Sequence, residues 1–353
     1  MNIAVDITPI SGKEISGHKV RGVGMYIANL TQNLQRFDHK NKYTFFVKGD
    51  KLPTGIDIVH YPYFDPFFKT LPVIKKYKTV VTVHDLTPIV FKDHFPAGIR
   101  GAVHWSIQKI LLKRVNHIIT DSENSKKDIL KILGIPEEKV SVVYLAADES
   151  FKVIDDKKIL NDVREKYNLP ENFLLYVGDV TWNKNLPRLV SVVKRLNVPM
   201  VMVGKALVSI DFDKTNEWNK DLVLVRKEIE GDKMFYPLGF LPTEELVALY
   251  NSAQALVMPS LYEGFGFPVL EAMQSGCPVV TSKGGSLAEV GGDAVSYIDP
   301  YDEDNMYEVI KKIFYDKKLQ EDFKNKGIIQ AKKFSWEKAI EQTIEAYRKT
   351  FGN

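Results

Sequence analysis

The amino-acid sequence predicts an α/β protein of two domains, each built on a parallel β-sheet with helices on both faces. The chain has 353 residues, a length that favours two domains of ordinary size over one. Short apolar runs alternate with amphipathic stretches, and the alternation breaks once near the middle before it starts again. The apolar runs hold few polar residues, as expected of strands buried on both faces of a parallel sheet.

The first half contains six short apolar runs, which predict strands at 3–8, 43–48, 56–60, 79–84, 117–120 and 140–144. Apolar residues at helical spacing predict helices at 24–37, 99–115 and 125–133. Gly134 and Pro136 follow the last of these helices, and both are typical of a helix end. We assign residues 1–150 to the first domain.

The second half repeats the architecture after a polar stretch at 147–158, which is expected to be the linker. Strands are predicted at 173–177, 200–203, 236–238, 255–258, 278–281 and 295–298. Helices are predicted at 186–196, 243–252, 268–275, 303–315 and 317–333. The second domain is therefore assigned to 151–334, and 335–353 is a final helix with Ser335 as its N-cap.

Composition and charge exclude several classes of protein. The formal net charge of +3 is too small to indicate nucleic-acid binding. The single cysteine, Cys277, excludes an internal disulfide and a cysteine-based zinc site, and we expect it to be a small buried residue. No apolar run is long enough to span a membrane, and the first residues lack the pattern of a signal peptide. A cytoplasmic location is expected.

Residues with chemical function follow several of the predicted strands. They are Gly22 and Gly24 after the first strand, His84-Asp85, Asp121-Ser122, the stretch 178–184 and the stretch 259–266. In α/β sheets, ligands bind beyond the carboxyl ends of the strands. Two sheets with such residues at their ends predict one cleft between two domains that face each other.

The most informative segment is 259–273, which has the composition of a strand end, a glycine-rich loop and a helix. Gly264 and Gly266 permit a close approach of the backbone to a ligand, and Pro268 suits the first position of a helix. Unpaired N–H groups and the helix dipole then create an anion site. Glu271 is expected in the first helical turn, where its carboxylate can accept hydrogen bonds from two ribose hydroxyls.

Seven residues separate Glu263 from Glu271, and this spacing resembles the E-x7-E pattern of retaining glycosyltransferases of family four, which have the GT-B architecture. The resemblance covers nearly the whole chain. It includes, in order, Arg21-Gly22-Val23-Gly24, Val83-His84-Asp85-Leu86, Asp121-Ser122-Glu123-Asn124-Ser125-Lys126, Tyr176-Val177-Gly178 with Lys184-Asn185, Gly239-Phe240, and Ser286-Leu287-Ala288-Glu289-Val290. A lone E-x7-E is a weak signal, but the ordered series is specific.

The resemblance implies two Rossmann-like domains that face a central cleft, with a C-terminal helix that crosses back to the first domain. It implies that the catalytic residues are Glu263, which contacts the transferred sugar, and His84, which lies against it. It implies that the donor is bound by Gly22, Gly24, Gly178, Lys184, Lys205, Gly264, Phe265, Gly266, Phe267 and Glu271. Within this set, Glu271 binds the ribose and Lys184 the diphosphate. Many members carry an arginine shortly before the lysine, whereas this chain has 178–183 without one. Two alternatives stay open: Lys184 neutralises the diphosphate alone, or Lys205 contributes a second cation.

The segments around His84 and 178–185 look like those of mannosyltransferases, so the expected donor is GDP-mannose and the expected acceptor a glycan or a lipid-linked glycan. Uridine and deoxythymidine donors stay open. No cofactor and no metal are expected, because Asp211-Phe212-Asp213 lies in a polar stretch typical of a solvated loop. The helix at 99–115 combines apolar and basic residues that suit peripheral contact with an anionic membrane: Trp105, Ile110 and Leu111 with Lys109, Lys113 and Arg114.

Other functions and ordinary structural roles remain as alternatives. A dinucleotide-dependent dehydrogenase is disfavoured because the first turn lacks Gly-x-Gly-x-x-Gly. A GT-B epimerase or phosphorylase would be recognised by its products when the donor is given alone. A catalytically silent partner protein is disfavoured by the combination of His84, Lys184, Glu263 and Glu271. Individually, these residues could also be a core histidine, a solvated lysine, a loop carboxylate and a helix-start carboxylate.

Overall fold

The structure is a computed structural model that describes residues 1–11 and 22–352. The chain divides into two compact units, unit 1 with Met1–Ala146 and Phe334–Asn353, and unit 2 with Ala147–Lys333. These divisions fall four residues and one residue before the boundaries predicted at 150 and 334. Arg21, which contributes to the family resemblance, lies outside the described residues.

Unit 1 is built on a six-stranded parallel sheet with the order β2-β1-β3-β4-β5-β6. Its strands are β1 (Asn2–Asp6), β2 (Lys42–Phe46), β3 (Ile58–Tyr61), β4 (Lys78–Thr82), β5 (His117–Thr120) and β6 (Val140–Val142). Its helices are α2 (Gly22–Phe37), α3 (Thr87–Val90), α4 (Gly98–Lys113), α5 (Glu123–Leu133) and α15 (Trp336–Gly352), with short 3-10 turns η1 (Thr8–Ile10) and η2 (Glu137–Lys139).

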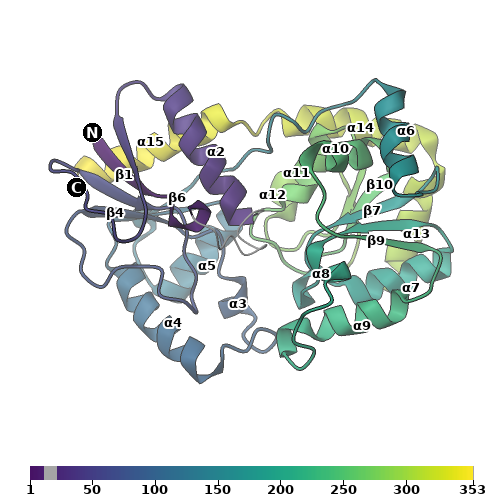
Figure 1. Cartoon of the computed structure of the whole chain (residues 1–353), viewed down its shortest axis with the longest axis horizontal. Helices are drawn as coiled ribbons and strands as arrows, with labels where there is room; N and C mark the ends of the chain where they lie inside the picture. Colours follow the sequence, from purple (N-terminus) through teal and green to yellow (C-terminus); the bar gives the residue numbers. More distant parts are fainter. Residues whose placement is uncertain (12–21, 353) are drawn as a thin grey trace. The chain divides into compact units, whose positions relative to one another are not determined.

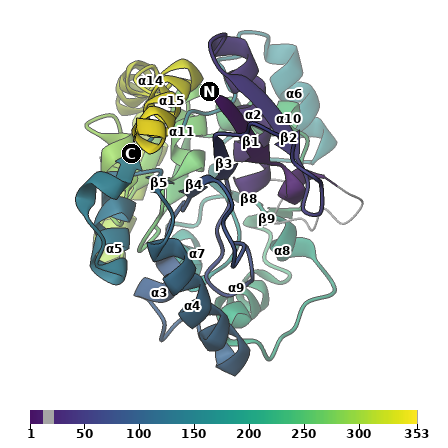
Figure 2. The same ribbon diagram turned by 90° about the vertical axis from the view of Figure 1, so that its left-hand side faces the viewer.

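Helices cover both faces of this sheet (Figures 1 and 2). On one face, Leu111 and Leu112 of α4 and Ile129 of α5 pack on buried strand residues such as Val81 and Ile118. On the other face, α15 packs against α2 and contacts β3, β4 and β5. The C-terminal helix therefore completes the core of unit 1, although its residues come last in the sequence.

Unit 2 is also built on a six-stranded parallel sheet, with the order β12-β11-β10-β7-β8-β9. Its strands are β7 (Leu174–Val177), β8 (Met200–Val203), β9 (Phe235–Leu238), β10 (Ala255–Met258), β11 (Val279–Thr281) and β12 (Ser296–Tyr297). Its helices are α6 (Lys157–Lys166), α7 (Leu186–Leu196), α8 (Lys205–Val208), α9 (Lys220–Ile229), α10 (Thr243–Ser252), α11 (Phe267–Gln274), α12 (Leu287–Gly291), α13 (Glu303–Tyr315) and α14 (Lys317–Ala331), with 3-10 turns η3 (Trp182–Lys184) and η4 (Glu217–Asn219).

The strand order of unit 2 reverses between β7 and β10. From β7 the chain moves outward in one direction to β8 and β9, and it returns to the other side of β7 for β10, β11 and β12. The helices α7, α9 and α13 bury one face of this sheet, as Figure 1 shows, through a core that includes Leu189, Val225 and Ile310. Ligands in such sheets bind where the order reverses, at the carboxyl ends of the strands. The loops after β7 and β10 occupy that position.

Several parts of the chain differ from the sequence prediction, and helices α3, α6, α8 and α12 lie outside the predicted helix ranges. Segment 147–158, expected to be a linker, is partly packed into unit 2, because Phe151 is buried and the Asp148 carbonyl accepts a hydrogen bond from Gln274 Nε2. Helix α9 was not predicted, although Leu222, Val225 and Ile229 are all buried at helical spacing.

Helix α4 has apolar residues on two sides. Leu111, expected to face a membrane, lies in the core instead, and Trp105 packs against the same cluster. The exposed apolar residues are Ile99, Val103, Ile107 and Ile110. Across the two described stretches of the chain, no helix is both long enough and apolar enough to pass through a membrane.

Candidate functional site

Two neighbouring segments hold the loop after β10, where Glu263 lies. On one side, Asn183 Nδ2 donates to the Tyr262 carbonyl (2.9 Å) and the Asn183 carbonyl accepts from the Leu261 N–H (2.7 Å). On the other side, the N–H of Ser286 donates to the Glu263 carbonyl at 3.0 Å. The loop is thus fixed between the segments that follow β7 and β11.

Gly285 allows the segment after β11 to approach the backbone of Glu263 closely. Its φ is +65°, and a Cβ at this position would lie 2.2 Å from the carbonyl oxygen of Glu263. Only glycine combines this backbone conformation with that distance. The backbone of Glu263 is therefore set by contacts that its own sequence segment does not contain.

The side chain of Glu263 forms an ion pair with Lys184. Lys184 Nζ lies 2.7 Å from Oε1 and 2.8 Å from Oε2 of the carboxylate. The two side chains are only 18% and 10% exposed, so water screens the pair poorly. An ammonium has three N–H donors, of which two point to this carboxylate. Lys184 and Glu263 were expected to contact different parts of the donor, but in the structure they form an ion pair with each other.

Glu271 lies in α11 but not where it was predicted. The helix begins at Phe267 with Gly266 as its N-cap (φ +100°), so Glu271 is its fifth residue and lies beyond the first turn. The interaction of the carboxylate with the helix dipole is correspondingly weaker than expected, because the effect falls off within one turn. The carboxylate is held instead by Tyr250, whose hydroxyl donates to Oε2 at 2.9 Å.

The segments after β7 and β8 meet through two glycines. A Cβ on Gly204 would lie 2.3 Å from the carbonyl oxygen of Gly178, so glycine is required at this approach. Lys205 begins α8 directly after Gly204 and is exposed. Among the described residues, no carboxylate forms an ion pair with Lys205.

In unit 1, Gly22 and Gly24 lie in the first turn of α2 as it is described, and Gly24 is buried. They were expected to follow the first strand and approach the diphosphate, with the helix beginning at Gly24, so the helix begins two residues earlier than predicted. Residues 12–21, which connect them to η1, lie outside the described part of the chain.

His84 follows β4 and pairs with a residue that follows the neighbouring strand. Its Nδ1 lies 2.7 Å from Oδ2 of Asp121, and the edge of the Tyr26 ring packs on the imidazole at a centroid distance of 4.7 Å. Burial lowers the pKa of His84, but the charge and hydrogen bond of Asp121 outweigh it, so the pKa lies above its ordinary value. Asp121 therefore holds the proton on Nδ1.

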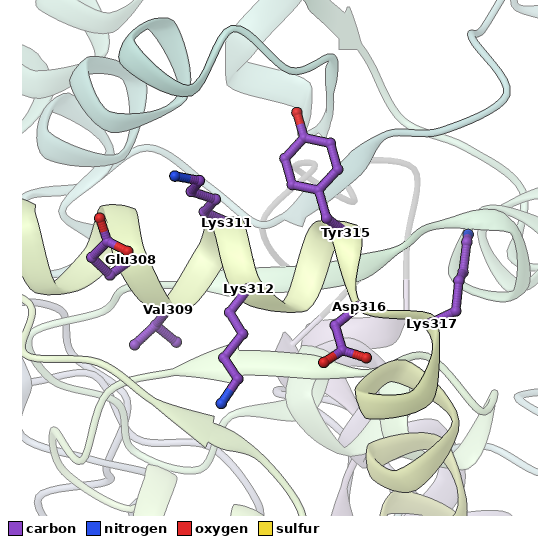
Figure 3. A pocket seen from close by; sticks show the side chains of 7 residues that line it. All are labelled: Glu308, Val309, Lys311, Lys312, Tyr315, Asp316 and Lys317. Atoms are coloured by element: carbon purple, nitrogen blue, oxygen red, sulfur yellow. The ribbon is translucent and has the colours of Figure 1, made fainter.

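No predicted site residue lines either of two surface hollows. Figure 3 shows the larger, about 810 Å³, whose lining side chains all come from the end of α13 and the start of α14: Glu308, Val309, Lys311, Lys312, Tyr315, Asp316 and Lys317. The second, about 270 Å³, is lined in unit 1 by Ile7, Ile10, Thr31, Gln32, Gln35 and Phe45. Within residues 1–11 and 22–352 there is no cluster of three or more histidine, cysteine or acidic side chains that could hold a metal ion.

Sequence reasoning placed Asp121 and Asn183 at strand ends but assigned them no contact, and it did not single out Tyr250. Their position at strand ends was the signal for the first two residues. Tyr250 gave no such signal, because an apolar helix position is normally explained by core packing.

Comparison with known proteins agrees with the fold and identifies the family. A family described as "Glycosyl transferases group 1" matches residues 160–330, and "Glycosyltransferase Family 4" matches 49–151. The O-antigen chain mannosyltransferase B of Escherichia coli is 31% identical over 77% of this chain and 70% of that protein. The serotype-specific mannosyltransferase WbdA of Escherichia coli is 27% identical over 77% of this chain, which spans only 33% of that protein.

Among solved structures, Alr3699/HepE of Anabaena in complex with UDP-glucose aligns with a TM-score of 0.72, at 16% identity and 99% coverage of both chains. At this identity the likeness concerns the fold, which is the two-domain α/β architecture of GT-B enzymes. Together, the family matches and the relative from Escherichia coli show that this chain belongs to glycosyltransferase family four and is a glycosyltransferase.

Proposed function

We propose that this glycosyltransferase transfers mannose from GDP-mannose to a glycan or lipid-linked acceptor of the O-antigen type, with retention of the anomeric configuration and without a metal. The relative named as an O-antigen chain mannosyltransferase supports the sugar and the acceptor class. The solved structure that holds UDP-glucose supports a nucleotide-sugar donor.

The observation that carries the proposal is the arrangement of charges at the β7–β10 reversal. Two of the three N–H groups of Lys184 bind Glu263, and we propose that the third binds the donor diphosphate. The N-terminus of α11 behind Gly266 has no side-chain cap, and the N–H groups of Val269 and Leu270 already donate to the Gly266 carbonyl, so we propose that the N–H of Phe267 binds the same anion. Lys205, exposed beside the Gly178–Gly204 contact, supplies the second cation that the missing arginine would provide.

Glu263 then has a positioning role towards the sugar rather than a nucleophilic one. The Lys184 ammonium makes this carboxylate a weaker nucleophile, because the ion pair stabilises the negative charge that an attack on the sugar would have to give up. In the proposed reaction the bond from the anomeric carbon to the diphosphate oxygen breaks as the acceptor oxygen attacks from the same face. The leaving phosphate oxygen takes the acceptor proton, so no separate protein base is needed.

His84 is proposed to contact the transferred sugar and to stabilise it as charge develops. Asp121 contributes by fixing the proton on Nδ1, and the Tyr26 ring limits rotation of the imidazole. Gly22 and Gly24 are proposed to allow the backbone of α2 to approach the diphosphate.

A thermal-shift screen over GDP-mannose, UDP-glucose and dTDP-glucose tests the donor, and mass spectrometry of the products tests the reaction. A ligand at 100 times its Kd adds about 2.7 kcal/mol to stability, which is easily detected. Stabilisation by GDP-mannose and transfer of mannose would support the proposal. Preference for a uridine or deoxythymidine donor would refute the mannose assignment. An isomerised sugar from donor alone, or sugar phosphate formed with phosphate, would indicate an epimerase or a phosphorylase.

We also propose that α4 rests on an anionic membrane. Its outer side carries Ile99, Val103, Ile107 and Ile110, which are between 41% and 89% exposed. They are three or four positions apart, so they form one stripe along the helix. Arg100, Lys113 and Arg114 are exposed on the same element and at its end. An apolar stripe with basic neighbours suits the interface of anionic lipids.

Sedimentation with vesicles of phosphatidylglycerol or of phosphatidylcholine tests this surface. The protein should sediment with the anionic vesicles, and V103S/I107S should weaken this binding. I329S, on α14, replaces another exposed isoleucine and serves as the matched control. Equal binding to both vesicle types, or equal effects of the two variants, would refute the membrane role of α4.

A further inference from the structure

Tyr250 is a completely buried tyrosine whose hydroxyl binds a carboxylate of the proposed donor site. It lies in α10 with 0% exposure, and it donates to Glu271 Oε2 at 2.9 Å. A buried phenol needs a hydrogen-bond partner, and a bond to a carboxylate is stronger than a neutral one. The Tyr250 ring is buried in unit 2 and held in place there. Its hydrogen bond therefore also restrains the more exposed side chain of Glu271.

The segment 148–154 fixes Tyr250 from the other side. Phe151, 4% exposed, packs its ring against that of Tyr250 with centroids 6.0 Å apart and planes at 66°. This near edge-to-face arrangement is the favourable geometry for an aromatic pair. The phenol therefore has little freedom to move away from the carboxylate.

The same segment is bound to both helices that carry the pair. On α10, Asn251 accepts from the Ile154 N–H (2.8 Å) and donates to the Lys152 carbonyl (2.9 Å). On α11, Gln274 donates to the Asp148 carbonyl at 2.9 Å. Helix α10, helix α11 and the segment 148–154 at the start of unit 2 are thus joined by contacts on both sides of the Tyr250–Glu271 bond.

We propose that Tyr250 is a positioning residue that orients the carboxylate of Glu271 towards the two ribose hydroxyls of a nucleoside diphosphate. The inference rests on the proposed function, in which Glu271 binds the ribose. A glutamate side chain has three rotatable bonds. Because Tyr250 restrains the Glu271 side chain before the ligand binds, less conformational entropy is lost on binding. Each carboxylate oxygen has two lone pairs, so an oxygen that accepts from Tyr250 can still accept from a hydroxyl.

The experiment compares ligands that differ only in the ribose hydroxyls. Calorimetry measures the Kd of GDP and 2′,3′-dideoxy-GDP, and of UDP and its dideoxy form, for the wild type, Y250F, E271Q and Y297F. Y250F removes one oxygen atom and keeps the ring that packs on Phe151. Y297F is the matched control, because Tyr297 also lies in unit 2 and donates its hydroxyl to a backbone carbonyl, that of Gly292.

We expect Y250F to weaken binding of the ribose form about five-fold while binding of the dideoxy form stays unchanged, and Y297F to alter neither. E271Q should reduce the preference for ribose further. An equal loss for both ligands in Y250F, or no loss, would overturn the positioning role. If E271Q leaves the preference for ribose intact, Glu271 does not bind the ribose and the inference falls; if neither diphosphate binds the wild type, the proposed donor itself is wrong.

Discussion

The Lys184–Glu263 pair permits a quantitative test of how unit 2 is stabilised. K184M removes the ammonium and leaves the Glu263 carboxylate, whose side chain is 10% exposed, without its counter-ion. Breaking a buried pair by removing one partner costs about 3–5 kcal/mol. Because the lysine side chain keeps 18% of its exposure, we expect the lower value, about 3 kcal/mol.

A double-mutant cycle distinguishes loss of the pair from loss of the individual side chains. Adding E263Q to K184M should restore most of the stability, because no buried charge then remains without a partner. K326M is the matched control, since the Lys326–Asp322 pair has a similar distance, 2.6 Å, but side chains that are about half exposed. We expect K326M to have no resolvable effect.

Thermal and urea unfolding followed by circular dichroism give the readout. For a unit of this size, about 3 kcal/mol corresponds to a fall in Tm of roughly 6–12 °C. Equal and small shifts for K184M and K326M would refute the reasoning, as would a double variant whose destabilisation equals the sum of the single ones.

Three further outcomes are expected. Full transferase activity should persist in EDTA, and activity restored only by Mg²⁺ or Mn²⁺ would contradict the metal-independent proposal. Azide should not rescue E263A as an inverted glycosyl azide, and a sugar-sized mass increase on Glu263 with a slow fluorinated donor would establish a covalent mechanism instead. Burial lowers the pKa of His60 to about 3, so the folded state excludes a proton that the unfolded state binds below about pH 6.5. The contribution of His60 to the unfolding free energy should therefore fall by about 2 kcal/mol from pH 7 to pH 5, so the pH dependence should be weaker in H60N; an unchanged pH dependence in H60N would show that His60 does not contribute.

Local patterns accounted for most of the secondary structure. All twelve predicted strands are present with ends that differ by a few residues, because a strand buried on both faces needs an unbroken apolar run. Helix α9 was missed because the polar stretch before it, which includes the exposed Asp211 and Asp213, hid the spacing of Leu222, Val225 and Ile229. The segment 147–158 was misjudged because its polar composition concealed Phe151, one buried side chain that fastens it to α10.

The sequence by itself determined the fold class, the family and the candidate residues, since apolar periodicity and motif spacing are properties of neighbouring positions. Only the tertiary structure decided how these residues pair. Lys184 and Glu263 are 79 positions apart, His84 and Asp121 are 37, and Tyr250 and Glu271 are 21. Parallel strands bring such distant segments to one edge of a sheet, and there a buried polar group is stabilised by a hydrogen-bond partner. A local sequence pattern does not predict which residues form these pairs. The pairs depend on which side chains the packed sheets and helices bring within hydrogen-bond distance.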